Sequence, residues 1–236
     1  MSNEKVLTIK ETFDLAVQNH QKGRLDVAQE FYNQVLKINP NHSFALSNIG
    51  VIFNDLGKLQ KAKVCFEKAI KKNPNYSDAH YNLGLIFNKL EENEKAKECY
   101  EKTIELNPNY ANAHNNLGNI FNELREIKKA KECFEKAIEL NPNHSDAYYN
   151  LGVIFNELRE IKKAKECYEK IIKLNPNYTK AHYNLGVIFN ELGEKQKAKE
   201  CYEKTIELNP NYANAHYNLG LIFNKLEENE KAKECY

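Results

Sequence analysis

The prolines of this chain recur at one fixed interval. They are Pro40, Pro74, Pro108, Pro142, Pro176 and Pro210, each 34 residues after the one before. The cysteines keep the same step and are Cys65, Cys99, Cys133, Cys167, Cys201 and Cys235. A fixed period of this size predicts a stack of similar units, because one unit is too small to bury its apolar side alone. The period therefore constrains the fold before any other feature is considered.

Residues 77–110 serve as an example of one unit. Apolar residues in its first half recur at steps of three and four, as on one face of a helix, and they are Ala79, Leu83, Ile86, Phe87 and Leu90. The second half repeats the pattern with Ala96, Cys99, Tyr100, Thr103, Ile104 and Leu106. Each unit is therefore predicted to be a hairpin of two helices.

Turn signals set the expected limits of these helices. Glu91–Asn93 are predicted to form the turn inside the hairpin. Asn107-Pro108 should end the second helix, because proline disfavours helical geometry in the residue before it. Asn109 is then expected to cap the next first helix. Gly84 and Ala96 are small, so we expect the two helices to pack closely at these residues.

The unit resembles a tetratricopeptide repeat (TPR). The residues that carry the resemblance are His80, Leu83-Gly84, Phe87, Ala96, Tyr100, Thr103 and Pro108. It implies an all-α fold, a right-handed superhelical solenoid of stacked antiparallel helix hairpins, as a single array over residues 1–236. The expected repeats are 9–42, 43–76, 77–110, 111–144, 145–178 and 179–212, with a partial repeat at 213–236.

Composition narrows the class of partner. The net charge is +1, which gives no sign of a nucleic-acid ligand. Lysines such as Lys128 and Lys129 alternate with Glu126 and Glu132, which is typical of a solvated helix face. No segment has the apolar length of a membrane span, and the first residues do not resemble a secretory signal. We therefore expect a cytoplasmic protein without a membrane partner.

No catalytic arrangement is visible in the sequence. Cysteines and histidines that lie 34 residues apart fall on different hairpins, beyond the reach of a shared metal or a disulfide. The cysteines, and the histidines His80, His114, His182 and His216, are interpreted as packing residues. The prediction is a non-enzymatic chain with no catalytic residue, no metal and no cofactor.

The resemblance places a ligand groove along the first helices of the repeats. Counting from the first residue of each unit, position 6 carries Asn48, Asn82, Asn116, Asn150, Asn184 and Asn218. Position 12 carries Asn88, Asn122, Asn156 and Asn190, along with Asn54, and position 5 carries Tyr81, Tyr149, Tyr183 and Tyr217. An amide both donates and accepts, so such rows suit the backbone of an extended peptide. The predicted function is a scaffold or adaptor that binds protein or peptide segments there.

Other interpretations of these residues remain open. The asparagines could instead form hydrogen bonds between repeats. The position-6 row also resembles the arm of O-linked N-acetylglucosamine transferase, and the first repeats resemble bacterial TPR arms fused to transferases, which implies a substrate-recruiting arm. A clamp for carboxylate tails is matched only at Lys180, Asn184 and Asn218.

The end of the chain suggests one further alternative. Residues 81–100 recur letter for letter at 217–236, where the chain stops inside an expected second helix. We expect either a piece of a longer protein or an exposed end. An exposed end would present Ile222, Phe223, Leu226 and Tyr236 and could stack on another copy as a homo-oligomer.

Overall fold

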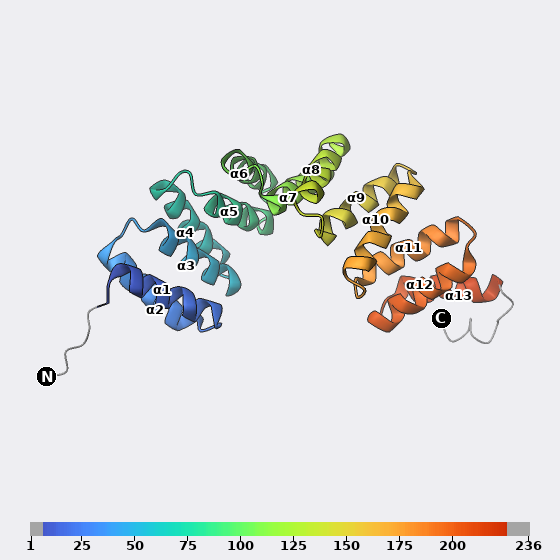
Figure 1. Ribbon diagram of the computed structural model, residues 1–236, viewed down its shortest axis with the longest axis horizontal. Helices are drawn as coiled ribbons and strands as arrows, with labels where there is room; N and C mark the ends of the chain where they lie inside the picture. Colours follow the sequence, from blue (N-terminus) through green and yellow to red (C-terminus); the bar gives the residue numbers. More distant parts are fainter. Residues whose placement is uncertain (1–6, 226–236) are drawn as a thin grey trace. The chain divides into compact units, whose positions relative to one another are not determined.

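The computed structural model describes residues 7–225, and that range contains thirteen α-helices and no strand (Figure 1). The chain divides into two compact units, one ending at Ile120 and one beginning at Phe121. The helices that end before this boundary are α1 (Ile9–Gln21), α2 (Leu25–Ile38), α3 (Ser43–Asp55), α4 (Leu59–Lys72), α5 (Ser77–Lys89) and α6 (Asn93–Leu106). The boundary falls within α7 (Ala111–Glu123), and the second unit continues with α8 (Ile127–Leu140), α9 (Ser145–Glu157), α10 (Ile161–Leu174), α11 (Thr179–Glu191), α12 (Lys195–Leu208) and α13 (Ala213–Lys225).

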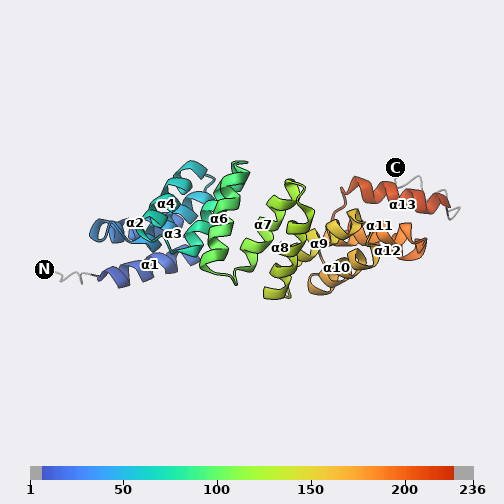
Figure 2. The ribbon, with the colours of Figure 1, turned by 90° about the horizontal axis from the view of Figure 1, so that it is seen from above.

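Each unit is a stack of helix hairpins. In the first unit, every helix from α1 to α6 contacts the next along the chain, and α3 also contacts α5. In the second unit, the same succession runs from α8 to α13, and Figure 2 shows α11 beside α12 from above. The predicted all-α solenoid of hairpins is confirmed.

A glycine and an aromatic ring meet at the centre of several hairpins, as α5 and α6 show. Ala96 and Tyr100 of α6 are fully buried. A Cβ atom on Gly84 of α5 would lie only 2.7 Å from Cε1 of Tyr100 and 3.2 Å from Cβ of Cys99. Gly84 is thus required because a ring occupies the space where its side chain would be, which confirms the expected close packing and names its cause.

The turns inside the hairpins share a left-handed residue. Gly57 and Gly193 have φ angles of 69° and 76°, which glycine adopts without strain. The equivalent residues Glu91, Arg125 and Arg159 adopt the same conformation, with φ of 60°, 61° and 60°. The expected turn at Glu91–Asn93 is nearly correct, but Asn93 already belongs to α6, whose N-cap is Glu92.

The helix starts differ from the expectation for Asn109. Because α7 begins at Ala111, Asn109 lies too early to cap it. The Asn109 backbone N–H instead donates to Oδ1 of Asn107 at 3.2 Å, within the turn after α6. Thr8 caps α1 by accepting from the Glu11 N–H, whereas the residue before each later first helix is tyrosine or histidine, and in two cases a histidine ring caps the helix. Nδ1 of His42 accepts from the Ala45 N–H at 3.2 Å, and Nδ1 of His144 accepts from the Ala147 N–H at 3.4 Å.

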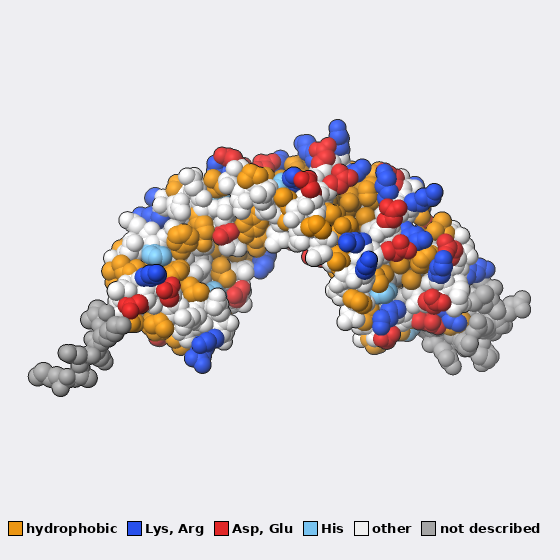
Figure 3. Space-filling view, in the orientation of Figure 1, with side chains coloured by type: hydrophobic (Ala, Val, Ile, Leu, Met, Phe, Trp, Pro, Cys, Tyr) orange, Lys and Arg blue, Asp and Glu red, His pale blue; other side chains and the backbone are white. Residues whose placement is uncertain are grey.

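Charged side chains alternate in sign along the second helices. Figure 3 shows Lys and Arg interspersed with Asp and Glu on the visible face of the second unit. Lys129 pairs with Glu126, and Lys131 Nζ lies 3.8 Å from a Glu135 carboxylate oxygen. The interpretation of these lysines as part of a solvated helix face agrees with these pairs.

The expected exposed end is wrong for two of its four residues. Ile222 is 1% exposed and Phe223 is 6% exposed, so neither offers a surface to a second copy. Leu226 and Tyr236 lie outside the described residues.

Candidate functional site

The candidate residues all lie on first helices of the hairpins. In the first unit, α3, α5 and α7 carry Asn48, Asn82 and Asn116 at position 6. In the second unit, α9, α11 and α13 carry the equivalent asparagines, which are Asn150, Asn184 and Asn218. All six are half-buried, so each is partly accessible to a ligand and partly in contact with the fold.

Several position-6 amides donate to tyrosine hydroxyls of the preceding hairpin. Asn48 Nδ2 donates to the Tyr32 hydroxyl at 3.0 Å. Asn116 Nδ2 donates to the Tyr81 hydroxyl at 3.3 Å. Asn218 Nδ2 donates to the hydroxyls of Tyr183 and Tyr202 at 3.4 Å and 3.5 Å. These asparagines therefore link successive hairpins, as the alternative interpretation of the row expected.

Asn82 differs from these neighbours. The ring at the equivalent place in the preceding hairpin is Phe66, which is 1% exposed and carries no hydroxyl. Among residues 7–225, none forms a hydrogen bond with the Asn82 amide. A half-buried amide of this kind retains its full capacity to donate and accept.

The position-5 tyrosines belong to aromatic clusters. The Tyr81 ring centroid lies 4.8 Å from that of Tyr110 and 5.9 Å from that of Tyr100. Tyr183 repeats this arrangement with Tyr212 and Tyr202, at 4.9 Å and 5.9 Å. Both tyrosines are half-buried, so part of each residue remains accessible.

The other two position-5 tyrosines vary this pattern. The Tyr149 ring lies 5.7 Å from Tyr178 and 6.1 Å from Tyr168, and Lys180 Nζ lies 5.9 Å from the Tyr149 centroid. Tyr217 is the most accessible member of the row, with 57% of its surface exposed.

Burial affects the acidity of one position-5 tyrosine and of two tyrosines beside the row. It raises the pKa of Tyr81 above its usual value, while the hydrogen bond from Asn116 acts in the opposite direction. Burial likewise raises the pKa of Tyr168 and Tyr202. The hydroxyls of Tyr81, Tyr168 and Tyr202 are therefore uncharged hydrogen-bonding groups at neutral pH.

The position-12 asparagines fall into three groups. Asn88 and Asn190 are exposed in the last turns of α5 and α11. Asn54 is held by Lys89, whose Nζ donates to its Oδ1 at 2.7 Å. The Oδ1 atoms of Asn122 and Asn156 are buried, and no residue in the described range donates to them.

The histidines at position 4 of the repeats, interpreted from the sequence as packing residues, also contact the backbone of the turn before their helix. Nε2 of His80 lies 2.9 Å from the carbonyl oxygen of Pro74, and His182 makes the same contact with Pro176 at 2.9 Å. His114 and His216 repeat it with Pro108 and Pro210 at 3.0 Å and 2.9 Å. Each ring therefore joins a first helix to the turn before it.

The cysteines are packed thiols. Burial raises the pKa of Cys99 and of Cys167 to about 12, so neither is a thiolate at neutral pH. Cys235 lies outside the described residues. Across residues 7–225, no group of three or more His, Cys, Asp or Glu side chains is arranged to hold a metal ion. None of the helices described is long and apolar enough to cross a membrane.

Comparison with solved structures identifies similar folds. PilF of Pseudomonas aeruginosa is 24% identical, with a TM-score of 0.75 over 82% of this chain and 88% of that one. YrrB, described as a TPR protein with an unusual peptide-binding site, is 22% identical, with a TM-score of 0.64 over 78% of this chain and 95% of that one. MamA is 28% identical, with a TM-score of 0.62 over 70% of this chain and 97% of that one. No curated protein matches the chain.

Family models match the chain along most of its length. One tetratricopeptide repeat model matches residues 43–76, 77–110, 111–144, 145–178 and 179–212. Two further tetratricopeptide repeat models match residues 14–42 and 201–234. Folds of this kind act as scaffolds for protein interactions. The chain belongs to the tetratricopeptide repeat family.

Proposed function

We propose that the first-helix face of the hairpins binds an extended peptide segment. In the first unit, this face is formed by α3, α5 and the part of α7 that carries Asn116. The asparagines at positions 6 and 12 bind the backbone of the peptide, and the position-5 tyrosines contact its side chains. The chain then acts as a non-enzymatic scaffold that holds a protein partner.

The observation that carries this proposal is the state of Asn82. Its amide is half-buried on α5 and forms no hydrogen bond with any residue from 7 to 225, although its neighbours on the row are held by tyrosine hydroxyls. Asparagine costs about 0.5–0.7 kcal/mol relative to alanine within a helix. A residue that neither stabilises the helix nor bonds within the fold is suited to a ligand.

The spacing of the row fits an extended chain. Packed helices lie about 8–10 Å apart, and an extended peptide rises about 3.3 Å per residue. Successive position-6 amides would then meet about every third peptide residue. The likeness to YrrB supports the fold that this mode of binding requires.

The test begins with a displayed library of unstructured 12- to 16-residue peptides (about the length that spans a few repeats) selected on the intact chain. The affinity of a selected peptide is then measured by fluorescence anisotropy for the intact chain and for Asn82→Ala. The matched control is Asn33→Ala, because Asn33 is exposed on the second helix α2, away from the proposed face. Circular dichroism first establishes that all three proteins have equal helicity.

We expect Asn82→Ala to weaken binding about tenfold, the loss of one to two hydrogen bonds to a ligand backbone, and Asn33→Ala to leave it unchanged. Equal affinities of all three proteins would remove Asn82 from the binding face. A dependence of apparent affinity on protein concentration would instead favour the alternative in which copies of the chain associate.

A further inference from the structure

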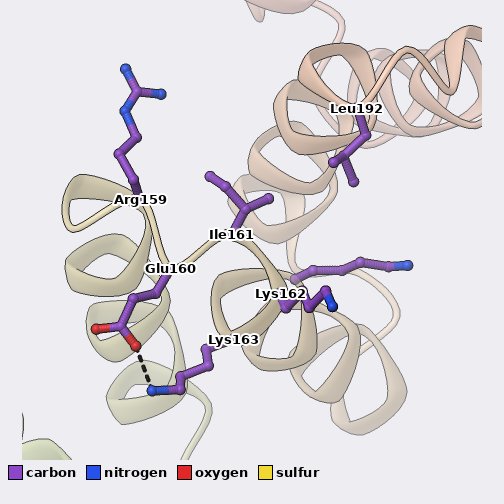
Figure 4. A pocket seen from close by; sticks show the side chains of 7 residues that line it. Arg159, Glu160, Ile161, Lys162, Lys163 and Leu192 are labelled. Atoms are coloured by element: carbon purple, nitrogen blue, oxygen red, sulfur yellow. Dashed lines mark hydrogen bonds and ion pairs between the residues drawn. The ribbon is translucent and has the colours of Figure 1, made fainter.

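A pocket on the turn edge of the second unit lies apart from the first-helix face. It has a volume of about 590 Å³ and lies between the α9–α10 turn, the start of α10 and the end of α11. Figure 4 shows Ile161, at the start of α10, and Leu192, which follows α11, on either side of it. Leu192 is 50% exposed, so an apolar side chain remains open to solvent here.

The rim of this pocket is basic. Arg159, Lys162, Lys163 and Lys165 line it, against one acidic residue, Glu160. Glu160 is already paired, because one of its carboxylate oxygens lies 2.5 Å from Lys163 Nζ (Figure 4). Lys162 forms no ion pair with any residue in the described range. Lys165 Nζ lies 3.7 Å from an oxygen of Glu169, so the positive charge that stays available at this edge comes from Lys162 and from the exposed Arg159.

Arg159 occupies a strained position on this rim. Its φ angle is 60°, where the equivalent residue of the next hairpin is Gly193 with φ of 76°. The guanidinium lies 3.7 Å from an oxygen of Glu191, but the Arg159 side chain is 79% exposed, so the pair adds little stability. An arginine that is unfavourable for the backbone and contributes little to the fold is more consistent with a role at the surface.

The same segment occurs one repeat earlier. Residues 125–131 and 159–165 both read REIKKAK. Lys131 Nζ lies 5.3 Å from the Phe155 ring centroid, and Lys165 Nζ lies 5.2 Å from that of Phe189, so the side chains repeat as well. Leu158, at the position equivalent to Leu192, is 49% exposed. The second unit thus presents the basic and apolar elements of this edge twice.

We propose that this turn-edge pocket binds an acidic peptide segment that carries a central apolar side chain. The apolar side chain enters between Ile161 and Leu192, while neighbouring Asp or Glu residues meet Arg159 and Lys162. Charge complementarity selects the acidic flanks, and the apolar walls select the central residue. This site is separate from the first-helix face and serves a different segment of a partner.

The test uses three fluorescein-labelled peptides of seven residues. The first has a central leucine between glutamates, the second has alanine in place of that leucine, and the third keeps the leucine between glutamines. Their affinities for the intact chain are measured by fluorescence anisotropy at low and at moderate salt. We expect the first peptide to bind at least about tenfold more tightly than either of the others, and to weaken as salt rises.

Two pairs of variants locate the site. Arg159→Gly relieves the backbone and removes the charge, and Glu91→Gly relieves the same turn conformation in the first unit without removing a base. Lys162→Glu reverses a charge on the pocket at the start of α10. Its control, Lys173→Glu, makes the same change in the last turn of α10, and both lysines are exposed. We expect Arg159→Gly and Lys162→Glu each to weaken binding of the first peptide about five- to tenfold, and both controls to leave it unchanged.

The proposal is overturned by any of three results. The first peptide could fail to bind at concentrations up to about 1 mM. It could bind no better than the peptide with central alanine, which would indicate attraction by charge alone. It could also be lost on Lys180→Ala, on the first-helix face, while Arg159→Gly binds normally. Because Arg159→Gly should be the more stable protein, its weaker binding could not arise from unfolding.

Discussion

Two junctions between hairpins in the first unit have a buried aromatic ring at the same place, but only one of these rings carries a hydroxyl. Where α2 meets α3, the Tyr32 ring is fully buried and its hydroxyl accepts a hydrogen bond from Asn48 at 3.0 Å. Where α4 meets α5, the Phe66 ring is 1% exposed and Asn82 has no hydrogen-bond partner among residues 7–225. One row of asparagines can therefore contribute to the fold at one repeat and remain available for a ligand at the next.

The largest change in stability should come from filling the space between the first-helix glycine and the ring, because Phe66 and Tyr100 both pack against a glycine. A Cβ on Gly50 would lie 2.8 Å from the Phe66 ring, and one on Gly84 would lie 2.7 Å from the Tyr100 ring. We expect Gly50→Ala and Gly84→Ala each to lower the free energy of unfolding by about 1–3 kcal/mol through overpacking. Urea denaturation measures both. A loss at only one of the two sites would contradict the view that Phe and Tyr fill the hairpin in the same way.

The second effect separates the two junctions. Asn48→Ala leaves the buried Tyr32 hydroxyl without its partner, at a cost of about 1–3 kcal/mol that outweighs the gain in helix propensity, so the free energy of unfolding should fall by about 1 kcal/mol. Asn82→Ala removes no bond within the described fold, and its gain in helix propensity should raise stability by about 0.5 kcal/mol. Thermal and urea unfolding measure the stability of each variant, which should fall for Asn48→Ala and rise for Asn82→Ala. If both variants lost the same stability, the contrast between the junctions would be wrong.

A third comparison concerns the turns inside the hairpins. Arg159→Gly should raise the free energy of unfolding by about 0.5–1 kcal/mol, because glycine adopts a positive φ angle at lower cost than arginine. Gly193→Ala should lower it by a similar amount for the same reason. Differential scanning calorimetry measures both changes, and a melting temperature that falls for Arg159→Gly would count against strain at that turn.

The smallest effect concerns the residue that caps α9. Burial lowers the pKa of His144, and the neighbouring Asp146 partly offsets this. The neutral form of His144 is therefore favoured in the folded protein. Its contribution to stability is complete above about pH 6.5, the usual pKa of histidine in an unfolded chain. The contribution is lost as the pH falls through the lower pKa of the folded state. His144→Tyr copies Tyr178, the residue at the equivalent place before α11, and should remove this part of the pH dependence. Melting curves between about pH 5 and pH 8 that overlay for the two proteins would exclude His144 as the cause.

Most of the fold follows from local patterns in the sequence. The period of Pro108 and its equivalents predicts the hairpins, and the apolar spacing from Ala79 to Leu90 predicts which face of α5 is buried. Asn109 was misassigned because the Asn-Pro-Asn turn uses Asn107 to bind the backbone and leaves the helix start to the following residue. Such a turn competes with a cap, and the choice between them depends on the path of the chain.

The candidate site is less accessible to sequence reasoning. The rows of asparagines are visible in the repeats, but the bond from Asn48 to Tyr32 joins residues of two hairpins and depends on how those hairpins pack. The change from Tyr32 to Phe66 is the one signal in the sequence that separates Asn48 from Asn82, and it has meaning only once that contact is known. The turn-edge pocket was missed for the same reason, since Ile161 and Leu192 belong to different hairpins.

The most direct test of backbone recognition is an N-methyl scan of a peptide selected on the intact chain. Each backbone amide of the peptide is methylated in turn, and the affinity of each form is measured by isothermal titration calorimetry. If the asparagines bind the backbone, affinity should fall about tenfold at amides spaced about three residues apart and change little between them. Uniform tolerance of methylation, with losses only when peptide side chains are altered, would contradict a site in which Asn82 and its neighbours bind an extended chain.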